Sequence, residues 1–409
     1  MSLWGAVVLA GLLLQAGLDL FAGALNVRAL RPELPAEFRG VYDPDRYRRA
    51  QEYARARARF GMVVEAASLA AVIAFWFAHG FDALDRFVRA LALGPVPTGL
   101  LFIAALALAR VVLALPFRWW STFVIEERFG FNRTTPRTFG ADVAKGLLLA
   151  ALLGGPLAAA ILWLFQVAGG LAWLWCWAAG TLFVLTVQFV APTWIMPLFN
   201  RFSPLPDGAL REAILAYARS VAFPLDGVFV IDGSRRSTKA NALFTGFGRH
   251  KRIALFDTLL ATLDPGEIVA VVAHEIGHYK RRHVLKGLAI AIAQMGAVFF
   301  LLSLFLRSEG LFHAFFMQEP SVHAGLVFFA LLLTPIDLVL SVVLHALSRR
   351  HEREADAFAR QTTGSGDRLA SALKRLSADS LANLTPHPLE VLLHYSHPPV
   401  LERVQALSA

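Results

Sequence analysis

The chain has 409 residues, of which 56% are hydrophobic and 17% are charged. Together with a mean hydropathy of +0.55, this composition excludes an ordinary soluble domain and indicates a protein with several membrane spans. The formal net charge of +9 does not indicate a nucleic-acid partner, because the basic residues gather in particular loops between apolar runs. The single cysteine, Cys176, lies in an apolar run, so the sequence excludes an internal disulfide and a thiolate metal site.

Apolar runs of spanning length recur along the chain, and about seven of them are long enough to cross a bilayer. They lie at about 3–25, 60–78, 98–117, 146–167, 170–195, 285–306 and 322–347. The first run has no basic segment before it and is followed by arginines, which favours a retained span over a cleaved signal peptide. We therefore predict a membrane domain over residues 1–199 with five spans, and spans six and seven over 285–347.

Basic residues predict how these spans are oriented. The loops after spans one and three, residues 26–59 and 118–145, are rich in arginine, whereas the connections on the other side carry few basic residues. By the positive-inside rule these two loops face the cytosol, the amino terminus lies outside and the carboxy terminus lies in the cytosol. The Ala-, Leu- and Arg-rich composition favours a bacterial cell membrane over an endoplasmic reticulum membrane.

Residues 200–284 are the one long polar stretch after span five, and we predict a small cytosolic α+β domain here. Turn-forming residues precede a helical pattern, and three short β-prone runs follow, at 203–208, 210–222, 227–231, 242–244 and 252–256 respectively. Asp264, Pro265 and Glu267 then form the pattern that starts a helix. No helix breaker precedes span six, so we expect this helix to run straight into the membrane.

That helix contains the sequence HEIGH, with His274, Glu275 and His278. Residues four apart lie on one helix face, so both imidazoles can reach one zinc ion while Glu275 acts on a water bound to it. The same pattern can arise by chance on an exposed helix. The helix start and a second acidic segment favour a zinc hydrolase instead.

The segment after span seven, within residues 348–409, is predicted to complete the site, because a catalytic zinc ion needs a third protein ligand. Glu352 and Asp356 are four residues apart, so Glu352 can bind the metal while Asp356 accepts a hydrogen bond from a ligand histidine. Glu354 and His351 remain alternative third ligands. The predicted ligands of one Zn²⁺ are His274, His278 and Glu352.

Further blocks of sequence, together with the two metal segments, resemble the type 1 CAAX prenyl endopeptidases, which are integral-membrane gluzincin metalloproteases. These blocks are 127–135, 197–202, 232–237, 241–244, 251–260, 394–399 and 402–403. Because the blocks are numerous and in the same order, the resemblance covers nearly the whole chain. It implies a mainly α-helical barrel of seven membrane helices around a large water-filled chamber, with the zinc site facing inward near the cytosolic side.

The resemblance also implies roles for residues at matching positions. His397 and Arg403 would lie by the metal, where they could donate to a developing oxyanion. Asn241 and Ala242 would belong to an edge strand whose backbone pairs with an extended substrate. Taken alone, Asn241 is more typical of a turn and His397 of a protein surface.

The predicted activity is cleavage of peptide bonds at the membrane, with Glu275 as the general base and Zn²⁺ as the cofactor. The expected partners are the lipid bilayer and a peptide or protein substrate, with or without a prenylated cysteine, and no nucleic acid. Two alternatives stay open. One is a quality-control protease of broad specificity, and the other is a transporter or receptor with a vestigial metal site.

Overall fold

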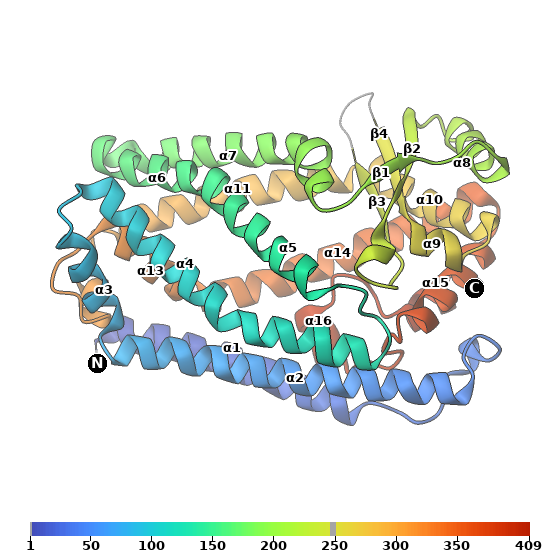
Figure 1. Cartoon of the computed structure of the whole chain (residues 1–409), viewed down its shortest axis with the longest axis horizontal. Helices are drawn as coiled ribbons and strands as arrows, with labels where there is room; N and C mark the ends of the chain where they lie inside the picture. Colours follow the sequence, from blue (N-terminus) through green and yellow to red (C-terminus); the bar gives the residue numbers. More distant parts are fainter. Residues whose placement is uncertain (1, 246–250) are drawn as a thin grey trace.

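A computed structural model describes residues 2–245 and 251–409 of the chain. Long helices run along the molecule, and a small sheet with several shorter helices lies at one end (Figure 1). The amino terminus lies at the end opposite the sheet, and the carboxy terminus lies beside the sheet (Figure 1). The fold is therefore mainly α-helical, as the sequence predicts.

Six helical segments within the described residues are long and apolar enough to cross a membrane. They are Leu3–Arg28 (α1), Pro44–Phe77 (α2), Pro95–Glu126 (α4, Pro95–Trp120, and a π-helical turn), Pro136–Val167 (α5, Pro136–Leu149, and α6, Gly155–Val167), Gly169–Leu198 (with α7, Ala172–Val190) and His283–Phe305 (α11). In α2, Asp43 caps the first turn and Pro44 follows it, so the basic stretch before the second apolar run is already helical. The expected multi-span architecture is confirmed.

The seventh predicted span is not one straight helix. It divides into α13 (Val322–Leu332) and α14 (Thr334–Thr363), which are bent by 53° at the junction. Pro335 lies in the first turn of α14. A proline has no backbone N–H and its ring clashes with the preceding turn, so it favours a kink or a break in the helix at this point. Counting this bent pair as one span gives seven among the described residues.

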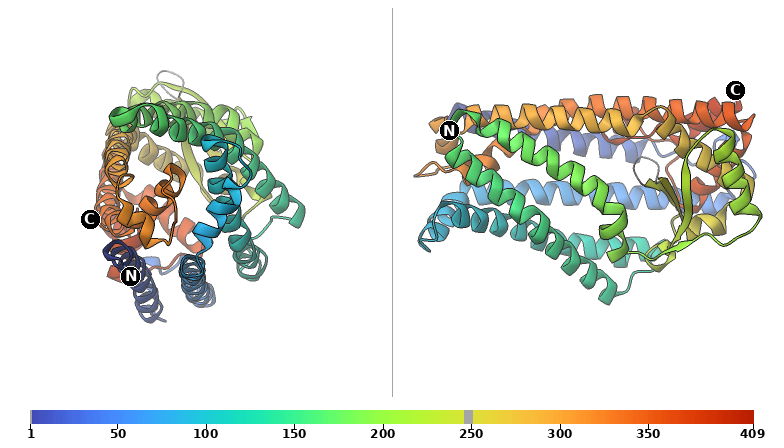
Figure 2. Two further views of the ribbon diagram at one scale, coloured as in Figure 1. Left: turned by 90° about the vertical axis from the view of Figure 1, so that its left-hand side faces the viewer. Right: turned by 90° about the horizontal axis from the view of Figure 1, so that it is seen from above.

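The long helices form a ring when the molecule is viewed along its length (Figure 2). Only 6% of the apolar window is buried in each of the segments Pro44–Phe77, Pro95–Glu126 and Pro136–Val167. A helix in a packed bundle buries the face toward its neighbours. Few residues of these spans are therefore fully covered by other parts of the protein.

The sheet has four strands in the order β1-β2-β4-β3. The strands are Phe202–Pro204 (β1), Leu225–Ile231 (β2), Ala242–Thr245 (β3) and Lys251–Phe256 (β4). β2 and β4 are parallel, whereas β1 and β3 are antiparallel edge strands. The turn expected at 203–208 is wrong at its start, because pairing of Phe202 with Ile231 gives β1 backbone partners that a short segment lacks by itself.

The remaining helices surround the sheet or connect the membrane helices. They are α3 (Gly80–Arg89), α8 (Ala209–Ser220), α9 (Asp257–Thr262), α10 (Pro265–Lys280), α12 (Glu309–Ala314), α15 (Asp367–Asp379), α16 (Pro388–His394) and α17 (Val400–Ser408). One buried core joins α8, the sheet, α10 and α15, and includes Ile214, Ile253, Ile268 and Leu369. This core gives α10 a fixed position.

The predicted uninterrupted run from α10 into span six is wrong. α10 ends at Lys280 and α11 begins at His283, with Arg282 in the left-handed conformation at a φ of 58°. A left-handed residue other than glycine is disfavoured by about 1–2 kcal/mol, so contacts elsewhere must offset it. The buried His283 supplies such contacts through hydrogen bonds described below.

Candidate active site

The start of α10 is set by a reciprocal cap. Asp264 accepts a hydrogen bond from the Glu267 backbone N–H at 2.9 Å, and the Glu267 carboxylate accepts one from the Asp264 N–H at 3.0 Å. Ile268, Val272 and Ile276 then bury one side of the helix in the core of the small domain. The capping residues and the apolar residues of α10 can both be recognised in the sequence. Together they fix the rotation of the helix that carries His274 and His278.

A glycine allows α14 to approach α10 closely. At Gly277 an added Cβ atom would lie 3.1 Å from the Ala355 Cα and 3.2 Å from the Ala355 carbonyl oxygen, which is tighter than ordinary contact. Gly277 lies between His274 and His278 in α10, and Ala355 lies three residues after Glu352 in α14. This close crossing places Glu352 beside the histidines.

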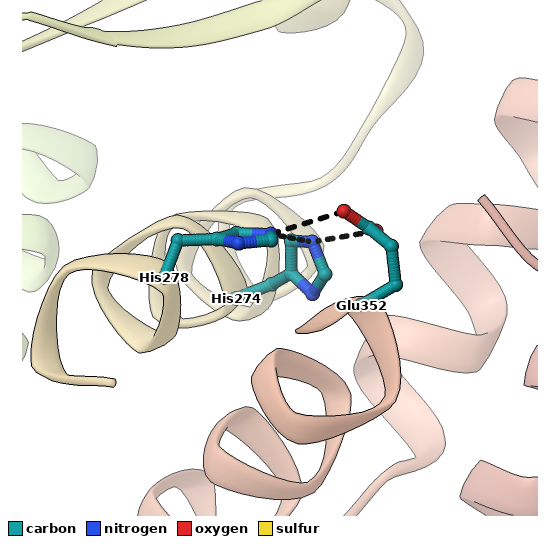
Figure 3. Close-up of side chains that lie close together, drawn as sticks. All are labelled: His274, His278 and Glu352. Carbon is teal, nitrogen blue, oxygen red and sulfur yellow. Dashed lines mark hydrogen bonds and ion pairs between the residues drawn. The ribbon is translucent and has the colours of Figure 1, made fainter. Parts of the chain in front are cut away.

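His274, His278 and Glu352 converge on one point (Figure 3). The Nε2 atoms of His274 and His278 lie 3.2 Å apart. Glu352 Oε2 lies 3.4 Å from His274 Nε2, and Glu352 Oε1 lies 3.2 Å from His278 Nε2. Two ligand atoms about 2.0 Å from a tetrahedral zinc ion lie about 3.3 Å apart. The two imidazole nitrogens have this spacing, and the Glu352 carboxylate lies close enough to both to offer an oxygen to the same ion. A fourth position is left for water.

The unsatisfied groups at this point also fit a cation. Glu352 Oε2 is buried and, among the residues that the structure describes, has no hydrogen-bond partner. A buried carboxylate oxygen without a partner is strongly disfavoured. Because the donor set is two imidazoles and one carboxylate, a bound divalent metal would satisfy both the oxygen and the two opposed nitrogens.

The two alternative third ligands, Glu354 and His351, have other partners. Glu354 forms an ion pair with Arg350 and a hydrogen bond with His283. The His351 ring stacks on the His283 ring, with the centroids 4.0 Å apart. Of the candidates on α14, Glu352 is the one that the structure brings to both histidines.

Asp356 joins His274 to Arg403. Its Oδ1 lies 2.8 Å from His274 Nδ1, and both of its oxygens accept hydrogen bonds from Arg403, at 2.8 and 2.7 Å. An Nδ1–H that donates to Asp356 leaves the His274 Nε2 lone pair free for a metal. Burial opposes the charged form of His274, yet the neighbouring carboxylates of Asp356 and Glu352 raise its pKa to about 9. A bound metal would take the place of the proton on Nε2. Burial also raises the pKa of Glu275.

His397 and Arg403 both lie near Glu352 but differ in freedom. His397 is 62% exposed, with its Nε2 3.4 Å from Glu352 Oε1 and its Nδ1 near the Ser396 hydroxyl. Arg403 is buried, with two of its nitrogens held by Asp356 and the third 3.6 Å from Glu352 Oε2. The geometry favours His397 over Arg403 as the group able to meet a substrate.

Ala242 is the first residue of β3, one of the two edge strands, and Asn241 directly precedes it. The Asn241 carbonyl accepts a hydrogen bond from the Phe256 N–H at 3.1 Å, so the backbone of Asn241 faces β4. Backbone groups alternate in direction along an antiparallel strand, so those of Ala242 face away from the sheet. The Ala242 N–H is covered by the Asn241 side chain, at 2.9 Å from its Oδ1.

His283 was not predicted to lie near the metal ligands. Its Nδ1 is 3.0 Å from His278 Nδ1, and its Nε2 is 3.0 Å from Glu354 Oε2. The sequence offered no signal for this contact, because residues five apart in a continuous helix lie about 140° apart around its axis. The contact exists because the helix breaks at Arg282.

A polytopic helical protein with two imidazoles and a carboxylate at this spacing belongs to the class of membrane-embedded metallohydrolases. Comparison with known proteins agrees. The family described as "CAAX prenyl protease N-terminal, five membrane helices" matches residues 24–201, and peptidase family M48 matches residues 204–409. The chain therefore belongs to the type 1 CAAX prenyl proteases of peptidase family M48.

Individual relatives are similar over almost their full length. CAAX prenyl protease 1 homolog from Oryza sativa subsp. japonica is 36% identical, over 93% of this chain and 91% of the relative. CAAX prenyl protease 1 from Saccharomyces cerevisiae is 34% identical, over 92% and 88%. The crystal structure of S. mikatae Ste24p superposes with a TM-score of 0.95, at 30% identity and 100% coverage of both chains.

These findings confirm the expected family and class of activity. The chain is a multi-pass integral-membrane metallopeptidase that acts on peptide or protein substrates. The alternative of a transporter or receptor with a vestigial metal site is not favoured.

Proposed function

We propose that this protein is a zinc endopeptidase that holds one Zn²⁺ on His274, His278 and Glu352. The observation that carries the proposal is the convergence of two imidazole Nε2 atoms, 3.2 Å apart, with the Glu352 carboxylate, whose two oxygens lie 3.4 Å and 3.2 Å from them. The Glu352 oxygen Oε2 is buried and has no hydrogen-bond partner among the described residues. That spacing and that donor set suit zinc. The expected substrate is a protein with a prenylated cysteine near its carboxy terminus, from which the final three residues are removed, since the relatives are named CAAX prenyl proteases.

When bound, zinc supplies Lewis-acid polarisation of a water molecule and of the scissile carbonyl. Glu275 accepts the proton of the attacking water and later donates it to the leaving amine. His397 donates a hydrogen bond to the developing oxyanion, which its exposure and its place beside Glu352 allow. Asp356 holds the His274 ring in the required orientation.

The edge strand β3 positions the substrate. An extended peptide can add to the sheet beside β3, where the backbone groups of Ala242 face outward. The Asn241 side chain occupies the Ala242 N–H without substrate, so binding must turn that side chain aside. This arrangement presents the backbone of the peptide and places few demands on its side chains.

We also propose that the ring of spans encloses a water-filled chamber and that the metal site faces it near the cytosolic side. The ring of long helices (Figure 2) and the small share of buried residues in three spans support the chamber, because helices packed into a solid bundle would bury more residues. The arginine-rich loops after spans one and three support a cytosolic site and an outward amino terminus. A bacterial cell membrane remains the proposed location.

Two measurements on the purified protein test the proposal. Metal analysis should find about one zinc per chain, and a quenched peptide should be cleaved. Glu275→Gln should retain zinc while cleavage falls by at least about 10³-fold, whereas the same change at the exposed Glu212 on α8 should leave both unchanged. Full cleavage by Glu275→Gln would contradict the assignment of the general base.

A matched pair of peptides tests the substrate. One peptide carries a farnesylated cysteine near its carboxy terminus, and the other has the same sequence without the lipid. Cleavage of the farnesylated form at a much higher kcat/KM supports CAAX processing. Equal cleavage of both forms would instead favour a quality-control protease of broad specificity. A protein without bound zinc or hydrolysis would contradict the proposed enzyme altogether.

A further inference from the structure

A second hydrogen-bonded path leads from α14 to the metal ligands, and it passes through a histidine. His278 Nδ1 lies 3.0 Å from His283 Nδ1, and His283 Nε2 lies 3.0 Å from Glu354 Oε2. The His283 side chain is only 4% exposed. One face of its ring stacks on His351 at an interplanar angle of 11°. His283 is therefore held in place by its packing as well as by its two nitrogens.

The break between α10 and α11 makes this contact. In an unbroken helix His283 would point about 140° away from His278. The left-handed Arg282 interrupts the helix, and His283 becomes the first residue of α11. The chain thereby turns the His283 ring back toward the last turn of α10. Arg282 directly precedes His283, so its disfavoured conformation is the local feature that lets the His283 ring reach His278.

The hydrogen bonds determine which nitrogen carries each proton. Two facing Nδ1 atoms of neutral imidazoles can share only one hydrogen. The Glu354 carboxylate accepts a hydrogen from His283 Nε2, which leaves His283 Nδ1 as an acceptor. His278 Nδ1 must then be the donor, and the lone pair of His278 lies on Nε2, the atom that faces His274 and Glu352.

We propose that His283 and Glu354 are positioning residues that fix the tautomer and ring orientation of His278 for metal binding. This inference rests on the zinc site proposed above. It gives the two ligand histidines equivalent support, since His274 reaches Asp356 directly and His278 reaches Glu354 through His283. Three acidic residues at alternate positions of α14 then serve one centre, Glu352 as a ligand and the other two through the histidines.

The decisive variant is His283→Phe, which keeps an aromatic ring against His351 and removes both nitrogens. Zinc affinity, measured by competition with a chelator, should fall by about 10- to 100-fold. The absorption spectrum of the Co²⁺-substituted protein should also change, because His278 is no longer oriented. The control is Arg350→Gln, since Arg350 bonds the other oxygen of Glu354 but is 72% exposed. Its zinc affinity should stay within about threefold of the parent protein.

A double-variant cycle separates positioning from a merely structural contact. Glu354→Gln alone should weaken zinc binding, and it should add no further loss in the His283→Phe background, because the path is already cut. Unchanged zinc affinity and an unchanged Co²⁺ spectrum in folded His283→Phe would overturn the inference, even if its melting temperature fell. If His283→Phe does not fold, unchanged affinity in Glu354→Gln and Glu354→Ala would overturn it.

The outcome for the parent protein keeps this inference distinct from the proposed function. If the parent protein binds no zinc, both the proposed function and the positioning role of His283 and Glu354 are contradicted. A parent protein that binds zinc and cleaves peptide, with variants that bind it equally well, removes only the positioning role of His283 and Glu354.

Discussion

Asp356 connects two buried groups, so its removal should have two effects that can be separated. It lies 2.8 Å from His274 Nδ1 and accepts two hydrogen bonds from Arg403. The side chains of Asp356 and Arg403 are only 9% and 10% exposed. Asp356→Ala therefore deprives a candidate metal ligand of its acceptor and leaves a buried guanidinium without its main partner.

The two effects have different expected sizes. Loss of a carboxylate behind a metal-binding histidine lowers metal affinity by about 10- to 100-fold, which corresponds to about 1.4–2.7 kcal/mol. Removal of one partner of a buried ion pair lowers the free energy of unfolding by about 3–5 kcal/mol. Glu352 also lies near Arg403, with its oxygen 3.6 Å away, and it cannot fully replace Asp356 while it binds metal.

A second variant separates these effects. In Asp356→Ala combined with Arg403→Met, no buried charge is left unpaired, so the free energy of unfolding of the metal-free protein should largely recover. Zinc affinity should stay low, because His274 Nδ1 still has no acceptor. Equilibrium unfolding in mixed micelles measures the first quantity, and chelator competition measures the second.

Recovery of zinc affinity in the double variant would refute this reasoning. It would mean that Asp356 acts on the metal only by neutralising Arg403. Unchanged zinc affinity in Asp356→Ala itself would also refute it, because the orientation of His274 would then be set by packing alone.

Three further outcomes are expected. Gly277→Val should force α10 and α14 apart at Ala355, lower the free energy of unfolding by about 1–3 kcal/mol and weaken zinc binding. Gly287→Val is the control, since an added Cβ there meets nothing within 4 Å. Equal zinc affinities of the two variants would count against the close crossing. Glu126→Gln should raise KM with little change in kcat. Glu126 forms a 2.8 Å ion pair with Lys239 that anchors the segment before β3, and the substitution weakens this pair by about 1–2 kcal/mol. A fall in kcat alone would contradict this role of the ion pair. Removal of the metal by a chelator should lower the melting temperature and abolish cleavage, and added zinc should restore both. Zinc at about 100 times its Kd stabilises the folded protein by about 2.7 kcal/mol. An unaltered melting temperature would contradict metal binding by the three ligand side chains.

Local patterns in the sequence predict much of the candidate site. The spacing of His274 and His278 places both on one helix face, and Asp264 with Glu267 marks where that helix begins. The β-prone runs also match three strands of the sheet.

The sequence by itself determines what depends on neighbouring residues: the apolar spans, the helix that carries the HEIGH motif and the face that its histidines share. Only the tertiary structure decides which acidic residue of α14 meets them, where β1 forms, and where the helix breaks at Arg282. The physical reason is that these features arise from contacts between residues far apart in the chain. The close packing of Gly277 on Ala355 and the hydrogen bond of His283 to Glu354 are contacts of this kind, and neither can be recognised from the adjacent residues.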